Sequence, residues 1–372
     1  MFSDSPEYCA RRDRPFSPTK VTIAELRAAI PKHLFEKNTT IGLLYVLRDI
    51  MCAVLVYKLG WLIEPATQSL VDFLYLPQVI GTFVLAPYHA WRASHHAHHK
   101  ATVSIERDEN YVPRTRKDYG LPPEAHAASR DYHEIFEETP IYTLARMMFM
   151  QLLGWQVYLL TDISGSPRHP TGTNHFMPTS PLFKDKDRRG IIASNLGISF
   201  MTSALYLWSK HVGVAMFVKL YLIPYILLNH WIVMLTYLHH SDPTVPMYRN
   251  SQWSFVRGAT STVDRPLLGW AGRFFFHNVS HDHISHHLFS SIPFYNQPLA
   301  TAEIKKVLKD DYNYDSTNSF RSLYRTFTQC CFIEDEGDIV FYKNREGKAA
   351  RVLSPDALTR PTLTAKGRYH SG

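Results

Sequence analysis

Two stretches of the chain carry no charged residue over a length that suits a membrane-crossing helix. They are Ile191–Ser209 and Leu220–Leu238, with 19 residues each. A helix rises about 1.5 Å per residue and needs about 20 apolar residues to cross the hydrocarbon core of a bilayer. Because only the short segment Lys210–Lys219 separates the two stretches, the pattern predicts a hairpin of two membrane-spanning helices. Pro224 lies inside the second stretch, where a membrane helix tolerates a proline.

Three weaker apolar stretches lie earlier in the chain. Ile41–Ile63 and Leu70–Pro87 contain charged residues, and the polar connector Glu64–Ser69 between them predicts another hairpin. Met147–Leu160 is apolar for only 14 residues. This run is too short to cross a bilayer and predicts an interfacial or buried helix. The alternative for the apolar stretches is a set of buried helices in a soluble protein.

Two hairpins leave both chain ends on the same side of the membrane. The basic ends place that side in the cytosol, because cytosolic segments are rich in Lys and Arg. The predicted fold is an all-α membrane protein with about four transmembrane helices, in two hairpins, under a cytosolic helical cap. The expected organisation is a cytosolic N-terminal segment (1–40), a first membrane hairpin (41–87), the first part of the cap (88–190), a second hairpin (191–238), the second part of the cap (239–342) and a basic tail (343–372).

Composition and charge narrow the class of protein further. The 372 residues have a mean hydropathy of −0.19 and a formal net charge of +7. This hydropathy is too polar for a chain that is mostly membrane, whereas the apolar residues are too clustered for a disordered chain. The four cysteines show no C-x-x-C spacing, which excludes disulfide-rich and zinc-ribbon proteins. The basic tail suits an anionic cytosolic leaflet, and it carries no motif that predicts a nucleic-acid partner.

Histidines gather in two short windows, one after each predicted hairpin. Each window contains the pattern H-x-x-H-H, in which positions i, i+3 and i+4 share one face of a helix. Three imidazoles on one face can reach the same metal ion. Two such triplets on the same predicted side of the membrane therefore predict a shared metal centre. The triplets are His95, His98 and His99 in the first window and His283, His286 and His287 in the second.

Other residues near the triplets are assigned less directly. His96 and His281 point away on helical geometry and are expected behind the ligands or at the surface. His239 and His240 end the last predicted span, and one of them is a candidate for an extra ligand, with two interfacial histidines as the alternative. Nearby carboxylates are either solvent-facing groups or acceptors for the ligand N–H groups. The candidate acceptors are Asp108, Asp264 and Asp282.

The donor set limits the choice of metal. An imidazole-rich site without thiolates suits Fe, Zn, Cu or Ni. Six or more histidines are too many for one tetrahedral zinc ion, so two metal ions are implied. A dinuclear all-histidine site at a membrane surface points to iron and to O2 chemistry on lipid. A membrane metal transporter is the alternative, but neither long uncharged stretch contains an acidic residue that could bind a metal inside the membrane.

Four longer stretches around these histidines carry a resemblance to a known family. They are Trp91–Pro113, Leu235–Tyr248, Arg257–Arg265 and Phe274–Asn296. Through them the chain resembles the membrane-bound acyl-lipid fatty acid desaturases, in particular the fungal and plant oleate Δ12 (omega-6) type, over most of residues 15–345. The resemblance implies a four-helix stem in the endoplasmic reticulum membrane under a cytosolic cap that holds the histidine motifs.

The resemblance also implies the ligands and the reaction. The triplets correspond to the second and third histidine boxes of the family, and His240 to a further histidine near the metals. All seven residues would bind a pair of iron ions, with O2 as co-substrate, to insert a double bond into an oleoyl chain of a membrane lipid. Cytochrome b5 and its reductase would supply electrons from outside the chain, because the haem-binding His-Pro-Gly-Gly is absent. The substrate-binding residues are not indicated.

The sequence departs from the family at the first histidine box. A pair spaced H-x-x-x-H is expected after the second membrane helix, but the chain runs from Gln78–Ala86 directly into Pro87–Trp91 and contains only His89 there. Two interpretations follow: an incomplete gene model or splice form of a working desaturase, or an inactive relative that binds lipid or a partner desaturase. The outcome of the reaction is also open between Δ12 desaturation, omega-3 desaturation, hydroxylation, conjugation and acetylenation.

Overall fold

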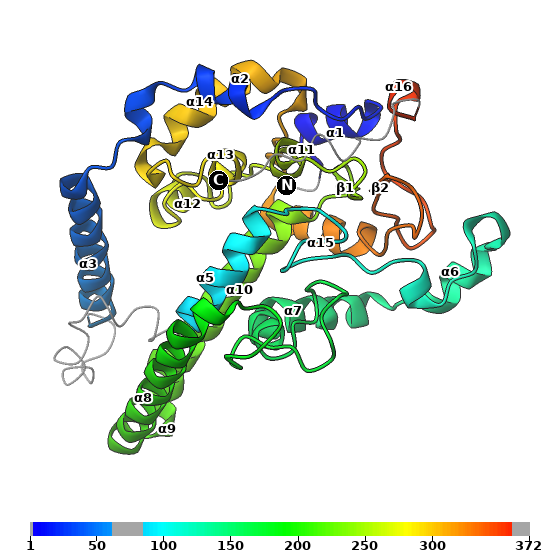
Figure 1. The fold of residues 1–372 in the computed structure, drawn as a ribbon. Coiled ribbons are helices and arrows are strands. Elements are labelled where there is room, and N and C mark those ends of the chain that lie inside the picture. The colour runs from blue at the N-terminus through cyan, green and yellow to red at the C-terminus, as the bar shows by residue number, and fades with distance from the viewer. Residues whose placement is uncertain (1–2, 62–84, 359–372) are drawn as a thin grey trace.

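Helices make up nearly all of the regular structure in the computed structural model, which describes residues 3–61 and 85–358 (Figure 1). This confirms the predicted helical class. One short antiparallel sheet, in which β1 pairs with β2, is the only sheet within these residues. The elements are α1 (Pro6–Asp13), α2 (Ile23–Ala29), α3 (Thr39–Trp61), α5 (Tyr88–His99), α6 (Ser129–Phe136), α7 (Pro140–Thr161), α8 (Arg188–Val212), α9 (Val214–Phe217), α10 (Ile223–His240), β1 (Pro246–Tyr248), α11 (Phe255–Thr260), α12 (Gly269–Phe275), α13 (His283–Leu288), α14 (Gln297–Leu308), α15 (Ser319–Gln329), β2 (Ile339–Phe341) and α16 (Pro355–Leu358).

Two long apolar helices occupy the second predicted hairpin. One covers Asp185–Val212 and includes α8, and the other covers Val214–His240 and includes α9 and α10. By length and composition both could cross a membrane. The predicted connector Lys210–Lys219 is too long, because both helices continue into it and only Gly213 separates them. Gly213 has a φ of 86°, a backbone conformation that glycine adopts without steric cost.

The second of these helices accommodates its proline at a local change of helix type. The π-helix η7 (Val218–Leu222) lies immediately before α10, and Pro224 occupies the first turn of α10. A proline lacks the N–H of a regular helical hydrogen bond, and its ring crowds the preceding turn. The wider π turn is one of the usual adjustments at such a point. The helix therefore continues past the proline to His240.

Helix α3 corresponds to the first helix of the earlier predicted hairpin. It covers Thr39–Trp61 and exposes a broad apolar surface over most of its described length. Two of its charged residues are held by neighbours: Arg48 pairs with Asp49 and donates to the carbonyl oxygen of Phe274, and Asp49 also contacts His277. The charges of Arg48 and Asp49 therefore contact protein groups.

The other half of that hairpin cannot be compared with the structure. The predicted helix Leu70–Pro87 falls almost wholly outside the described residues, and the connector Glu64–Ser69 falls entirely outside them. The total of four membrane spans therefore stays a prediction. The same holds for the boundaries of the predicted segments.

Helix α7 is longer than the apolar run that predicted it. It has 22 residues and packs along α10. Its opposite face exposes large apolar side chains, including Ile141 and Phe149. One face on protein and another apolar face left exposed are typical of a helix at a membrane interface. The buried side chains recur every four residues, at Thr143, Met147, Gln151, Trp155 and Leu159.

The cap contains an apolar core that orients the second histidine triplet. Helices α2, α11, α13 and α14 pack around this core, and Figure 1 shows α2 and α14 side by side at its top. Helix α13 contributes Ile284 and Leu288 to the core. These positions lie on a different face of α13 from His283, His286 and His287. Burial of the two apolar residues therefore turns the three imidazoles toward α5 and α10.

A network of buried charges ties the N-terminal helix to the end of α10. Arg265 donates to the carbonyl oxygen of Leu238 (2.8 Å) and pairs with both Asp242 (2.7 Å) and Asp315. Arg11 of α1 also reaches Asp242, at 3.5 Å. Asp242 and Leu238 flank the last residue of α10. The network therefore sets the position at which this helix enters the cap.

Candidate metal centre

Three elements that are far apart in the sequence bring histidine side chains together. Helix α5 ends with the first triplet, α13 contains the second, and α10 ends at His240. Within the described residues, their candidate ligand atoms form two groups of three, and the atoms of each group lie within 4.8 Å of one another. The inner group is His98, His240 and His287, which are buried, and the outer group is His95, His99 and His286, which are partly exposed.

His283 adjoins the inner group and extends it to four side chains. Its Nε2 atom lies 3.0 Å from Nε2 of His240 and 3.1 Å from Nε2 of His287. Two nitrogens that bind one metal ion at right angles, each about 2.1 Å from it, lie about 3.0 Å apart. The spacing of these side chains therefore suits neighbouring ligands of one metal ion. All seven predicted ligands belong to the extended inner group or to the outer group.

Hydrogen bonds at Nδ1 orient two of the inner histidines. Nδ1 of His98 lies 2.8 Å from Oδ1 of Asp108, and Nδ1 of His283 lies 3.2 Å from the carbonyl oxygen of Val279. A neutral imidazole has a single N–H, and both partners accept hydrogen bonds. The proton therefore sits on Nδ1, and Nε2 is left with a free lone pair that can bind a metal.

Thr102 orients a third inner histidine, His287, in the same way. Its Oγ1 donates to the carbonyl oxygen of His98 (2.8 Å), so its one hydroxyl proton is used there. The contact of 3.1 Å between Oγ1 and Nδ1 of His287 is then an N–H donated by the imidazole. Sequence reasoning missed Thr102. Its position four residues after His98 predicts only the bond back to the last turn of α5, and its contact with the second triplet depends on the fold.

Burial favours the neutral form of three imidazoles of the centre, those of the second triplet. It lowers the pKa of His283 and His287 well below the usual value and that of His286 to about 4. The neutral ring is the form that binds metals. With their protons on Nδ1, His283 and His287 direct two lone pairs at each other across 3.1 Å. A cation between them removes this repulsion, so the donor set fits a metal ion.

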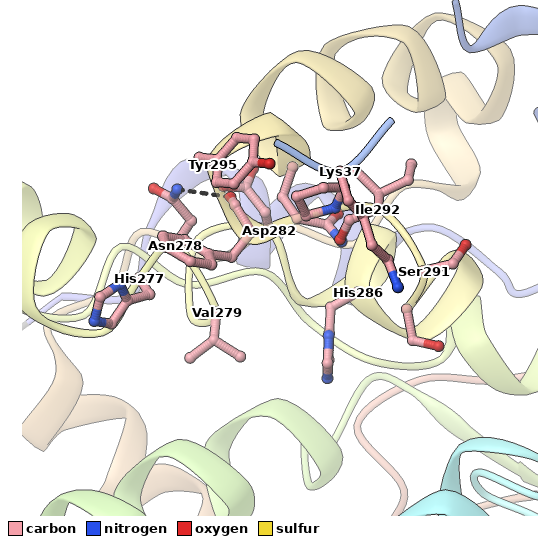
Figure 2. A pocket seen from close by; sticks show the side chains of 13 residues that line it. Lys37, His277, Asn278, Val279, Asp282, His286, Ser291, Ile292 and Tyr295 are labelled. Atoms are coloured by element: carbon pink, nitrogen blue, oxygen red, sulfur yellow. Dashed lines mark hydrogen bonds between the residues drawn. The ribbon is translucent and has the colours of Figure 1, made fainter. Parts of the chain in front are cut away.

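The outer group rests mainly on ring contacts. The ring of His95 stacks on Trp91 at 4.5 Å between centroids, and the Nε2 atoms of His95 and His99 lie 3.1 Å apart. None of the outer histidines makes a hydrogen bond through Nδ1 within the described part of the chain. His286 and Lys37 line a cavity of about 520 Å³, and Figure 2 shows both side chains among those around it. The outer group therefore borders open space.

The three predicted carboxylates are all buried, so the alternative of solvent-facing groups is wrong. Asp108 contacts the inner group as described above. Asp264 accepts from the backbone N–H of Ile284 (2.8 Å) and holds the first turn of α13. Asp282 pairs with Arg273 (2.9 Å). Within the described residues neither the carboxylate of Asp264 nor that of Asp282 bonds to an imidazole of the two groups, and both act on the segment that carries the second triplet.

The remaining histidines near the centre belong to neither group. His96 is exposed and His281 is half-buried. His239 is buried, and its ring nitrogens contact the carbonyl oxygen of Val263 (2.6 Å) and a serine hydroxyl (3.2 Å). Of the pair that ends α10, only His240 joins a group of candidate ligand atoms, whereas His239 stacks its ring on His283 at 4.3 Å between centroids. The fold separates two neighbouring histidines because successive helical residues point about 100° apart.

The predicted loss of the first histidine box concerns a region that the structure only partly describes, since 62–84 lie outside the described residues. His89 is the one histidine that the sequence offers there. Its backbone N–H donates to Ser194 (3.0 Å), and its ring lies 3.0 Å from where a Cβ on Gly190 would be. His89 thus packs against α8 and joins neither histidine group.

A histidine outside the predicted set, His169, bonds to two carboxylates next to the inner group. Nδ1 of His169 lies 2.7 Å from Oδ2 of Asp162, and its Nε2 lies 2.7 Å from Oε2 of Glu109. Asp162 follows the last residue of α7 and has a left-handed backbone conformation. Glu109 directly follows Asp108, the acceptor for His98. The clamp Asp162–His169–Glu109 therefore connects α7 to that acceptor. No local motif marks it, because its members come from separate segments.

The clamp is expected to weaken at alkaline pH. Hydrogen bonds to Asp162 and then to Glu109 raise the pKa of His169 to about 9. Because the folded-state pKa is raised, the stabilisation is fully present below about pH 6.5, the usual value for histidine, and is lost as the pH rises through about 9. The substitution His169→Gln should therefore lower the thermal midpoint near neutral pH and have little effect above about pH 10.

The matched control for the clamp is His133→Gln. His133 lies on the exposed side of α6 and pairs only with exposed Glu137, and such surface pairs contribute little to stability. The thermal midpoint of the His133→Gln protein should equal that of the wild-type protein at every pH. A deficit of the His169→Gln protein that stays constant between neutral and alkaline pH would show that the charge on His169 does not stabilise the fold.

Comparison with known proteins finds a family model and relatives that all concern enzymes of fatty acids. Residues 66–318 match the family model described as fatty acid desaturase. A Δ12 fatty acid desaturase of Mortierella alpina is 35% identical over 375 residues, which cover 89% of this chain and 92% of the relative. An oleate hydroxylase of Claviceps purpurea is 32% identical over 404 residues, covering 91% and 84%. An omega-6 fatty acid desaturase of Brassica juncea, named for the endoplasmic reticulum, is 30% identical over 373 residues, covering 89% and 94%.

Proposed function

The chain belongs to the fatty acid desaturase family, and from this premise we propose that it introduces a cis double bond at the Δ12 position of an oleoyl chain on a membrane lipid. The observation that carries the proposal is the convergence of both histidine triplets with His240 in one centre. This centre lies at the end of a helix that is long and apolar enough to cross a membrane. It is therefore near the place where lipid acyl chains are available.

We assign two iron ions to the centre, one to the extended inner group and one to the outer group. When bound, they would activate O2, the co-substrate and oxidant, for the removal of hydrogen from an unactivated methylene group. The chain itself gives His98, His283 and His287 a partner at Nδ1, which leaves Nε2 of the neutral ring free. Asp108 and Thr102 hold His98 and His287 in the required tautomer and direction. Burial of the inner group keeps water away from the place where the acyl chain reacts.

We also propose the partners and the location of the protein. Cytochrome b5 and its reductase supply the electrons, and the protein is a multi-pass protein of the endoplasmic reticulum membrane with its histidine motifs in the cytosol. The name of the Brassica juncea relative supports this location. Two candidate membrane helices and a basic C-terminal segment are consistent with it. Nucleic acid is not among the proposed partners.

Hydroxylation of the same acyl chain is the second candidate. The Claviceps purpurea oleate hydroxylase is 32% identical to this chain, which is close to the 35% of the Mortierella alpina Δ12 desaturase. Both reactions can begin with the removal of one hydrogen from a methylene group. They differ in whether a second hydrogen is then removed or a hydroxyl group is added. The same histidine centre can therefore support either product.

The predicted loss of the first histidine box leaves two interpretations of this particular chain. One is an incomplete gene model or splice form of a working desaturase, and the other is an inactive relative. The alignment with the Mortierella alpina enzyme is 375 positions long, but only 89% of the 372 residues of this chain take part in it. The other positions of the alignment are gaps in this chain. The relative therefore has residues without a counterpart here, which is consistent with a shortened chain.

The test of the proposed function is expression in a yeast that makes no polyunsaturated fatty acids. Accumulation of the chain in membranes is checked first, and total fatty acids are then profiled by gas chromatography against a strain with an empty vector. We expect linoleate, which carries the second double bond at Δ12. Hydroxylated oleate would favour the second candidate instead.

Absence of a new fatty acid, despite protein in the membrane, would contradict the proposed activity for this chain. Insertion of a family-type first histidine box after residue 86 then separates the two interpretations. A shortened form of a working desaturase should gain linoleate synthesis from the insertion. An inactive relative should not.

A further inference from the structure

The two histidine groups differ in burial and in number of ligands. The extended inner group has four imidazoles, and each is at most 8% exposed: His98, His240, His283 and His287. The outer group has three imidazoles within the described residues, and all are partly exposed. One of them, His286, also lines the cavity in Figure 2. The inner group therefore offers more ligands than the outer group, and its ligands are less exposed to water.

The groups also differ in how firmly their rings are held. Asp108, Thr102 and the carbonyl oxygen of Val279 each contact Nδ1 of a different inner histidine. No such bond reaches an outer histidine within the described part of the chain, and among the inner histidines only His240 lacks one. Partners of this kind fix the tautomer and the direction of a metal-binding imidazole, and their loss typically costs 10–100-fold in metal affinity.

We propose that this chain binds one divalent metal ion tightly at the extended inner group and a second one more weakly at the outer group, so that the two sites fill in sequence. The inference rests on the proposed function only for the identity of the ion as iron. The difference in affinity follows from the ligands themselves. We expect it to be at least about tenfold, because three orienting hydrogen bonds favour the inner group and none favours the outer.

Thr102 is the positioning residue on which the inference depends most directly. Its hydroxyl links the two triplets, since it donates to the carbonyl oxygen of His98 and accepts from His287. Without this acceptor the proton of His287 is free to move to Nε2, which removes the lone pair needed for the metal. The substitution Thr102→Val removes the acceptor and keeps the shape of the side chain, whereas Thr102→Ser retains the acceptor.

The test is a metal titration of the full-length chain, purified in detergent and stripped with a chelator. Co2+ serves as the probe, its visible absorption reports the ligand field of each site, and metal content per chain is measured after gel filtration. We expect a first equivalent to bind at least about tenfold more tightly than a second. His286→Ala should remove the second equivalent and leave the first unchanged.

Three threonine variants then test the mechanism. Thr102→Val should weaken binding of the first equivalent by about 10–100-fold, and Thr102→Ser should restore most of it. The matched control is Thr301→Val, because Thr301 of α14 is equally buried and its hydroxyl has no partner among the described residues. This control should bind both equivalents as the wild-type protein does. Each variant is first compared with the wild-type protein by gel filtration to confirm that it is folded.

Two equivalents of equal affinity would overturn the inference, as would a folded Thr102→Val protein with unchanged binding of the first equivalent. Failure to bind any Co2+ would also overturn it. The readout is independent of the proposed reaction. Sequential binding without linoleate synthesis in yeast would reject the proposed function alone, and linoleate synthesis with two equal sites would reject this inference alone.

Discussion

Replacement of His287 with alanine is expected to abolish desaturation and to remove the tightly bound metal ion. His287 is buried, its Nε2 atom lies 3.1 Å from that of His283, and its Nδ1 atom bonds to Thr102. The substitution removes a ligand and leaves a cavity at the centre of the inner group. Because loss of a residue behind a ligand already costs about 10–100-fold, loss of the ligand itself should reduce linoleate in the yeast assay by more than about 100-fold.

His96→Ala is the matched control for this substitution. His96 belongs to the first histidine window but is exposed and lies outside both groups. Its replacement should leave linoleate and metal content as in the wild-type protein. Fatty acids are profiled by gas chromatography, and the metal in purified protein is measured by mass spectrometry. If His287→Ala retained its metal and its product, His287 could not be a ligand of the catalytic centre.

Replacement of Arg265 with methionine is expected to lower the free energy of unfolding by about 3–5 kcal/mol. The Arg265 side chain is 2% exposed and pairs with two carboxylates, Asp242 and Asp315, which are themselves buried. Methionine keeps much of the side-chain volume and removes the charge. Two buried carboxylates then share the remaining arginines of the network, Arg11 and Arg325. The cost of an incompletely neutralised buried charge is the source of the loss.

The comparison protein for this experiment is Arg12→Met. Arg12 of α1 is next to Arg11 in sequence, but its side chain is 41% exposed and pairs only with exposed Asp13. Such pairs contribute about 0–1 kcal/mol. Unfolding by denaturant in detergent is followed through tryptophan fluorescence. The network would not be a major source of stability if the Arg265→Met and Arg12→Met proteins unfolded at the same denaturant concentration.

Loss of Arg265 should also affect the metal centre. Its guanidinium holds the carbonyl oxygen of Leu238 and the carboxylate of Asp242, on either side of His240. These contacts determine where α10 presents His240 to the other imidazoles. The N-terminal helix α1 takes part through Arg11. A segment more than two hundred residues away in sequence therefore supports the inner group.

Periodicity over a few residues was sufficient to predict much of this protein. An uncharged, largely apolar run of 19 residues is typical of a membrane helix, and both such runs form a long apolar helix. The pattern H-x-x-H-H places three imidazoles on one helix face because of the 3.6-residue turn. The family follows from these motifs and the stretches around them, and the comparisons confirm it.

Contacts between distant segments had no such local signal. Thr102 and His287 are separated by 185 positions, and neither residue indicates the other. Burial of Asp264 and Asp282 depended on an N–H group and a guanidinium that the fold brings to them. The division of seven histidines into four inner and three outer side chains depends on how α5, α10 and α13 pack. A residue's own helix determines where its side chain points, whereas the packing of whole elements determines which atoms it meets.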